Sequence, residues 1–355
     1  MRQRSHDAPR GRAEARAVGL WLAACCAMIF VMVVLGGITR LTESGLSMVE
    51  WRPLIGAIPP LGEQEWQRTF ELYRQTPEYR TINRGMSLTE FKTIFWWEYL
   101  HRLWGRLIAV IFAVPFLWFL WRRRLPAGAV PKLAVMFVLG ALQGLMGWAL
   151  VQSGLADRPE VSHYRLTAHL GFAVAILGYI LWVALGYLRG PTAASTPPAR
   201  PGLRRFAGGL TGLTFLTLLS GGLVAGLDAG LTYNSFPLMD GRLVPEGLMV
   251  LQPAWRNPFD NPAMVQFDHR VLALLTAGLV AVFWLRVQAA AVPPGARLAV
   301  HAFMAMALVQ VAVGVATLLM AVPIPLAVLH QAGAVALFAL ALWTRFEMRA
   351  SARRG

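Results

Sequence analysis

Residues 96–121 read WWEYLHRLWGRLIAVIFAVPFLWFLW. The stretch exceeds the roughly 20 apolar residues that cross a bilayer as a helix, yet a glutamate, a histidine and an arginine stand near its start. Apolar stretches of similar length recur along the chain, so the sequence predicts an all-α polytopic membrane protein with eight transmembrane helices. The other predicted spans are 18–38, 133–151, 166–188, 206–227, 265–285, 298–320 and 326–343.

The distribution of charge predicts how these spans are oriented. Hydrophobic residues make up 56% of the chain and charged residues only 14%, well below the charged fraction of an average soluble domain. The net charge of +15 could indicate a nucleic-acid partner, but the basic residues gather in the segments on one side of the membrane. By the positive-inside rule that side is cytoplasmic. We therefore expect a multi-pass protein of the cell inner membrane that contacts membrane lipid, has both termini cytoplasmic and binds no nucleic acid.

The two halves of the chain resemble each other weakly on either side of a stretch rich in Pro, Ala, Ser and Thr at 190–202. Because each half has an even number of spans, both halves run in the same direction through the membrane. We therefore predict two pseudo-symmetric four-helix bundles in a parallel internal repeat. The matching residues are Gly36-Gly37 with Gly221-Gly222, His101-Arg102 with His269-Arg270, Gln143 and Gly147 with Gln310 and Gly314, and His169 with His330.

This repeat gives the expected domain organisation. A cytoplasmic basic tail (1–17) precedes an N-terminal bundle (18–189), a cytoplasmic linker (190–202), a C-terminal bundle (203–345) and a cytoplasmic tail (346–355). The first large outer loop contains amphipathic stretches such as 63–73, which could form short interfacial helices. The second, 228–262, is rich in Pro, Gly and Asn and is predicted to be an irregular lid. The adjacent cysteines of the first span, Cys25 and Cys26, are interpreted as core residues and not as a disulfide.

Four histidines fall one to each even-numbered span: His101, His169, His269 and His330. Counted from the basic residues at the inner helix ends, at about 1.5 Å per residue, all four lie at a similar depth toward the outer side. Paired imidazoles on facing helices are what a six-coordinate haem iron requires, so we predict one haem site in each half. Hydrogen bonding between helices is the alternative interpretation. The remaining histidines have no repeat partner and are predicted to be surface residues: His6, His163 and His301.

Polar neighbours distinguish the two predicted sites. Glu98 stands three residues before His101, whereas Gln266 stands three residues before His269. A carboxyl group beside a haem edge can move protons or stabilise developing positive charge, and an amide cannot. We therefore predict reaction in the first half and a resident cofactor in the second, the alternative being a glutamate that merely faces water. The arginine after each histidine could bind a haem propionate or merely extend to the headgroups: Arg102 and Arg270.

These motifs resemble the haem A synthase family over nearly the whole chain, from about 18 to 343. The resemblance rests on GGITRLTESGLS at 36–47 and EYLHRLWGR at 98–106, with DHR at 268–270 and LHQ at 329–331 in the second half. One branch of the family carries a pair of cysteines in an outer loop beside the active site. This chain lacks that pair and is similar to the branch that proteobacteria and mitochondria share.

The resemblance implies an oxidoreductase that converts the C8 methyl group of haem O to the formyl group of haem A for terminal oxidase assembly. Water would be the oxygen source, and electrons would pass to an acceptor that the sequence does not name. The resemblance further implies a haem B cofactor with His269 and His330 as iron ligands, haem O as substrate at His101 and His169, and Glu98 as the catalytic carboxylate. Haem O synthase (a farnesyltransferase) and oxidase assembly factors are the implied protein partners.

Two other functions fit the residues taken alone. A b-type cytochrome that passes electrons from quinol to a partner would hold both haems permanently and would need no carboxylate at a haem edge. A haem transporter or chaperone would release its haem unchanged. Conversion of haem O to haem A would distinguish the synthase from both.

Overall fold

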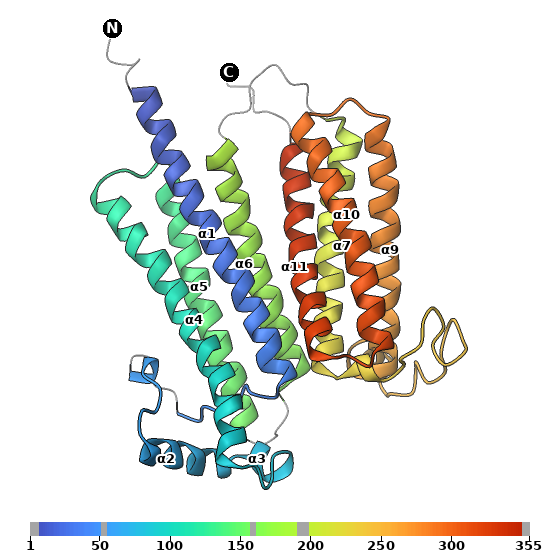
Figure 1. The fold of residues 1–355 in the computed structure, drawn as a ribbon. Helices are drawn as coiled ribbons and strands as arrows, with labels where there is room; N and C mark the ends of the chain where they lie inside the picture. The colour runs from blue at the N-terminus through green and yellow to red at the C-terminus, as the bar shows by residue number, and fades with distance from the viewer. Residues whose placement is uncertain (1–6, 51–54, 157–160, 190–198, 350–355) are drawn as a thin grey trace.

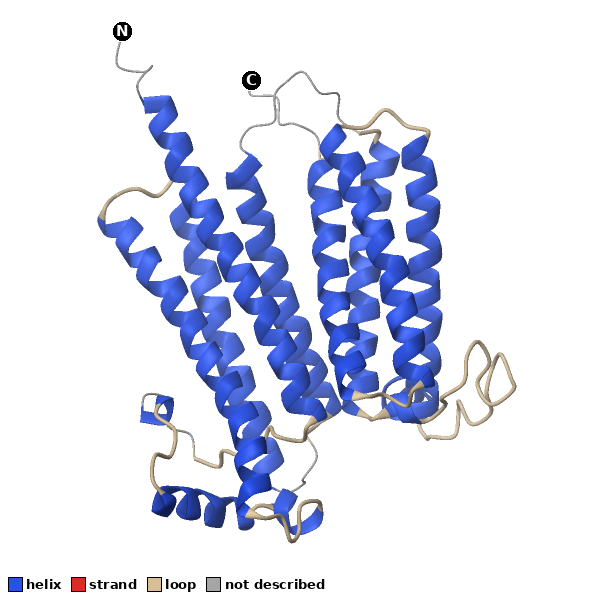
Figure 2. Ribbon diagram, viewed as in Figure 1, coloured by secondary structure: helices blue, strands red, loops and turns tan. Residues whose placement is uncertain are grey.

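The chain folds as a set of long helices in the computed structural model, which describes residues 7–50, 55–156, 161–189 and 199–349 (Figures 1 and 2). Eight of these helices are long and apolar enough to cross a membrane, which confirms the predicted spans. No β-strand is formed within these ranges. The eight are α1 (Asp7–Leu41), α4 (Leu88–Trp121), α5 (Ala129–Ala156), α6 (His163–Arg189), α7 (Pro201–Gly226), α9 (Pro262–Gln288), α10 (Pro294–Leu319) and α11 (Ile324–Glu347).

The membrane helices pack in two groups of four that stand side by side (Figure 1). Helices α1, α4, α5 and α6 form the first group, and α7, α9, α10 and α11 form the second. The groups meet where α1 and α6 contact α11 and where α6 contacts α7. The symmetry relation between the groups and the domain boundaries stay predictions, and most of the predicted linker, 190–198, lies outside the described residues.

Local signals in the sequence fix where several helices begin. Ser87 accepts a hydrogen bond from the backbone of Glu90, whose side chain accepts one in return, so this capping box starts α4 eight residues before the predicted span. Asn261 caps α9 and is followed by Pro262 at the first helical position. The extra turns carry the start of α4 beyond the apolar span and toward the first loop.

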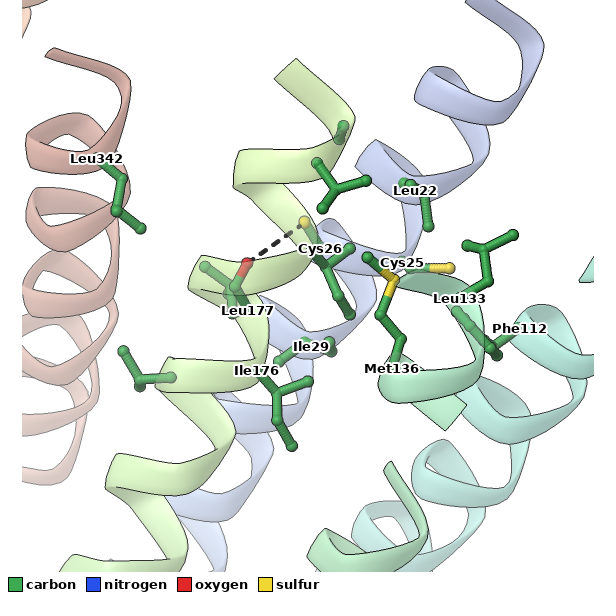
Figure 3. Packing of buried hydrophobic residues seen from close by; sticks show 14 of the residues in the cluster. Leu22, Cys25, Cys26, Ile29, Phe112, Leu133, Met136, Ile176, Leu177 and Leu342 are labelled. Carbon is green, nitrogen blue, oxygen red and sulfur yellow. Dashed lines mark hydrogen bonds between the residues drawn. The ribbon is translucent and has the colours of Figure 1, made fainter. Parts of the chain in front are cut away.

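The core of the first group lies between α1, α5 and α6 (Figure 3). Leu22, Cys25 and Cys26 of α1 are buried there beside Leu177 of α6 and Met136 of α5. Both cysteines are free, as predicted, and the thiol of Cys26 donates to the carbonyl of Leu177 at 3.8 Å. A polar S–H is thereby satisfied in a region where lipid offers no hydrogen-bond partner.

The first loop folds into a small helical lobe at the end of the molecule opposite the start of α1 and the end of α11 (Figure 1). It contains the short turn η1 (Ile55–Ala57) and the helices α2 (Glu63–Arg74) and α3 (Pro77–Thr81). The predicted amphipathic stretch 63–73 is indeed helical, and its apolar face packs against the first turns of α4. The aromatic residues that form this contact are Trp66, Phe70, Tyr73, Phe91, Phe95 and Tyr99.

The second loop is largely irregular and holds only η2 (Ala229–Leu231), η3 (Ala254–Arg256) and α8 (Asn257–Asp260). Asn257 is fully buried and organises it, since its side chain accepts from the backbone of Leu251 at 3.0 Å and donates to the carbonyls of Leu251 and Ala254 at 3.0 and 2.9 Å. Both loops lie at the same end of the molecule (Figure 1).

One carboxyl group of the lobe is buried almost completely. Glu78 is 3% exposed, its Oε1 accepts from the hydroxyl of Tyr73 at 3.3 Å, and its Oε2 has no partner among the described residues. Desolvation, and secondly the charge of Glu98, raises the pKa of Glu78 to about 8. The folded lobe therefore favours the protonated carboxylic acid.

We predict that Glu78→Gln stabilises the lobe in a pH-dependent way. Between the ordinary glutamate pKa of 4.5 and about 8, the unfolded wild-type chain ionises while the folded chain stays protonated, so wild-type stability falls as pH rises. Glutamine cannot ionise, and the gain in melting temperature over wild type should grow from pH 5 to pH 8. Thermal unfolding of the detergent-solubilised wild type and variant at several pH values measures this difference in melting temperature. A difference that does not vary with pH would contradict the prediction.

Candidate functional site

Each of the four histidines that the sequence repeat matches faces a glycine on a neighbouring helix of its own group. A methyl group on these glycines would lie 2.7 to 3.2 Å from Cε1 of the imidazole. At Gly314 this is closer than side chains pack, and at the other three it is tighter than most side-chain contacts, so glycine favours the close approach of the ring to the facing backbone. The pairs are Gly36 with His101, Gly147 with His169, Gly221 with His269, and Gly314 with His330.

These contacts join the residues that the sequence repeat matched. Gly36 and Gly221 occupy matching positions and meet matching histidines, and the same holds for Gly147 and Gly314. The glutamines of the repeat take part as well, because the amides of Gln143 and Gln310 lie 3.2 and 3.0 Å from Nδ1 of their histidines. The two halves thus build the same set of side-chain contacts around two separate histidine pairs.

The histidines of the second half have the spacing of a metal-bridging pair. The ring centroids of His269 and His330 are 6.3 Å apart, and their planes are perpendicular at 88°. Two imidazole nitrogens that bind one metal ion, each at about 2.0–2.1 Å, place the ring centres roughly 6 Å apart. His269 and His330 would therefore be the residues that hold a haem iron in the second half.

In the second half the other nitrogen of each ring is occupied. Nδ1 of His269 lies 2.8 Å from the hydroxyl of Ser220, and Nδ1 of His330 lies 3.0 Å from the amide of Gln310. The Ser220 contact can leave Nε2 of His269 for a metal, and the Gln310 amide holds the orientation of the His330 ring. Sequence reasoning assigned no role to Ser220, although it directly precedes Gly221.

The first half brings His101 of α4 and His169 of α6 within electrostatic range of each other. Nδ1 of His169 meets Gln143, as described above, but Nδ1 of His101 is buried without a hydrogen-bond partner in the described part of the chain. The first pair therefore shares the glutamine contact of the second pair and lacks the hydroxyl contact.

Glu98 does not face water, so that alternative interpretation is wrong. Its side chain is 3% exposed and accepts hydrogen bonds from the hydroxyl of Ser47 at 2.7 Å and the backbone of Met48 at 2.6 Å. It also forms a close ion pair with Arg102, whose guanidinium donates to the carbonyl of Met48 at 2.9 Å. Glu98 and Arg102 together hold residues 47–48 of the first loop against α4.

The second half has the same kind of clamp without the carboxylate. Gln266 donates to the carbonyls of Gly230 and Tyr233 at 3.3 and 3.1 Å, and Arg270 donates to those of Tyr233 and Ser235, both at 2.8 Å. Ser47 and Met48 of the first loop donate hydrogen bonds to Glu98. In the second loop, carbonyl groups accept hydrogen bonds from Gln266. This difference gives a structural reason for a carboxylate in one half and an amide in the other. The Nε atom of Arg270 is buried and has no partner among the described residues, so one donor stays free for an acidic ligand group.

The second glycine of each Gly-Gly pair contacts the opposite half. Gly37 of α1 lies against the amide of Gln331, which donates to the carbonyl of Val33 at 2.8 Å. Gly222 of α7 lies against Thr167 and Leu170 of α6. Gln331 and Leu170 directly follow His330 and His169, so the two histidine pairs are adjacent across the interface between the halves. An ion pair between Arg40 and Asp228, at 2.8 Å, joins the halves at the loop end.

The other histidines do not enter these sites. Nε2 of His163 lies 3.1 Å from Asp260, and Nδ1 of His301 accepts from the indole of Trp284 at 3.0 Å. His301 is exposed as predicted, whereas His163 is half-buried against the second loop. His6 lies outside the described residues.

Comparison with known proteins adds an independent line of evidence. The family model described as "Cytochrome oxidase assembly protein" (COX15-CtaA) matches residues 19–342. The haem A synthase of Nitrosospira multiformis is 52% identical over 332 residues, which cover 94% of this chain and 93% of the relative. The haem A synthase COX15 of Homo sapiens is 44% identical over 345 residues, which cover 95% of this chain and 84% of the relative.

The glycine contacts predict a specific loss of haem binding. In Gly314→Ala the new methyl group would lie 2.7 Å from Cε1 of His330, so the ring must move out of line with His269. We expect the purified variant to lose most of the haem bound in the second half, as measured by Soret absorbance per protein. Gly212→Ala is the matched control, because Gly212 is a helix-interior glycine of the same group with nothing within 4 Å of the new methyl. Equal haem content in the two variants would contradict the prediction.

Proposed function

The chain belongs to the COX15-CtaA family of cytochrome oxidase assembly proteins, and from this premise we propose that it is a haem A synthase. The enzyme is an oxidoreductase that acts on the C8 methyl group of haem O. Hydroxylation of the methyl gives an alcohol, and further oxidation gives a gem-diol that loses water to leave the formyl group. Water supplies the oxygen, so electrons and protons leave the substrate and the electrons pass to an acceptor.

The second half holds the cofactor. The single observation that carries this assignment is the 6.3 Å separation of the His269 and His330 rings, with both Nδ1 atoms occupied. Haem B between these rings would supply a one-electron relay. The free Nε donor of Arg270 suits a propionate carboxylate, which would otherwise be a charge without a partner in a region of low polarity.

The first half holds the substrate. His101 and His169 bind the iron of haem O, and Glu98 stands on the same face of α4 as His101, one turn nearer the loop. As a carboxylate buried beside that ligand, Glu98 can accept the protons that leave the methyl group and stabilise positive charge on the substrate. Arg102 orients the carboxylate, and Ser47 and Met48 fix its position.

We place this activity in the cell inner membrane, with both termini cytoplasmic and both sites toward the periplasm. The basic segments of the sequence support this orientation. Haem O synthase, which makes the substrate, and oxidase assembly factors, which take the product, are the proposed protein partners.

Replacement of the carboxylate tests the chemistry. Glu98→Gln should leave haem B content unchanged but lower conversion of haem O by about 10²–10⁴-fold, the usual contribution of a general acid or base. The measurement is mass analysis of extracted pigments after expression in cells that make haem O. Ser47→Ala is the matched control, because it removes one hydrogen bond to Glu98 and keeps the ionisable group. Equal loss in both variants, or wild-type conversion in Glu98→Gln, would exclude Glu98 from the chemistry.

Replacement of the histidines tests the assignment of the halves. His269→Ala and His330→Ala should deplete haem B in the purified protein, since each removes one of its two iron ligands. His101→Ala and His169→Ala should retain haem B and form no haem A. Haem B loss confined to the latter pair would reverse the assignment. Equal loss from all four variants, without formyl product in wild type, would instead indicate a two-haem cytochrome.

A further inference from the structure

The two histidine pairs differ at one hydrogen bond. The residue before the first glycine of each Gly-Gly pair is Ser220 in the second half and Leu35 in the first. Ser220 Oγ lies 2.8 Å from Nδ1 of His269, whereas Leu35 offers no polar side chain to His101. The backbone carbonyl of Leu35 faces His101 and also accepts from the hydroxyl of Thr39 at 2.8 Å, so no side chain supplies an acceptor at Nδ1 of His101.

The direction of the Ser220 hydrogen bond follows from its second partner. A serine hydroxyl has one proton, and Ser220 donates it to the carbonyl of Thr217 at 2.7 Å. Its oxygen must therefore accept from Nδ1–H of His269, which places the free lone pair of that ring on Nε2. The protein thus holds His269 in the one neutral tautomer that can bind iron through Nε2.

We infer that Ser220 is a positioning residue that makes His269 a permanent haem ligand, and that Leu35 at the matching position leaves His101 an exchangeable one. An acceptor at Nδ1 raises the basicity of a ligating imidazole and fixes its orientation, so it strengthens the iron–nitrogen bond. Without a side-chain acceptor at Nδ1, His101 is a weaker ligand that can release its macrocycle. This inference rests on the proposed function, because only an enzyme whose substrate and cofactor are both haems needs one site that releases and one that retains.

The second histidine of each pair does not show this contrast at Nδ1. His169 and His330 both have a glutamine amide at Nδ1, and all four rings lie against a glycine. The inference therefore rests on the position of Ser220 and Leu35 and not on the second ligand of each pair.

The test exchanges the two side chains in the full-length protein. In Ser220→Ala we expect haem B to transfer to apomyoglobin at least tenfold faster than in wild type, with a higher midpoint potential because a less basic imidazole stabilises ferric iron less. Ser220→Thr keeps a hydroxyl and should restore both values. Thr214→Ala is the control, since it removes a buried hydroxyl of α7 that bonds only the carbonyl of Leu210. A release rate and a potential in Ser220→Ala equal to those of the control would overturn the inference.

The reciprocal variant gives a second, independent readout. Leu35→Ser should place a hydroxyl at His101 and slow the release of product haem. Haem A should then stay bound in the purified protein. Release of haem A at the wild-type rate would overturn this half of the inference. Failure of the proposed function is distinguishable, because it would appear as haem-loaded wild-type protein without formyl product. Haem release and potential in Ser220→Ala would still be measurable in that case.

Discussion

The structure depends on the approach of an imidazole ring to a bare helix backbone. In the membrane interior a histidine side chain gains nothing from water, and two rings can meet at the centre of a bundle only if the neighbouring helices leave room for them. Glycine provides that room four times, once for each histidine. These contacts place each ring against a neighbouring helix, and the rings of His269 and His330 lie 6.3 Å apart. The apolar core around α1 and α6, by contrast, could accept many residues of similar volume.

On this common framework the halves differ in a few polar side chains, and each difference has a local cause. Glu98 meets donors from its loop, and Gln266 meets acceptors. Ser220 supplies a hydroxyl where Leu35 has none, and Gln331 bonds across the interface where Leu170 only packs. The two halves thus keep the same fold and differ in their hydrogen bonds. Such a difference would let two similar macrocycles bind with different strength at the two sites.

Much of the fold and of the candidate site could be predicted from the sequence. Hydropathy, glycine pairs and histidine spacing are patterns among residues that lie close together along the chain. The eight spans and the family were predicted and are confirmed.

The early start of α4, the burial of Glu98 and the role of Ser220 were not predicted. Each depends on a segment far away along the chain: α4 is extended by its contact with α2, Glu98 is covered by residues 47–48, and Ser220 acquires its role only when α9 packs against α7. The sequence also suggested that the arginines bind haem propionates or extend to the headgroups, which stays a prediction, and the structure adds that both guanidinium groups donate to loop carbonyls.

The contacts between the halves have a consequence for how such an enzyme could arise. Gly37 touches the residue after His330, and Gly222 touches the residue after His169, so each half presents the same patch to the other. Reciprocal contacts of this kind are those of an isologous homodimer. In a dimer of identical subunits, however, a serine at one ligand would be a serine at both, and the two sites would bind their haems equally. Fusion of the subunits into one polypeptide removes that constraint, because each site can then change without its twin.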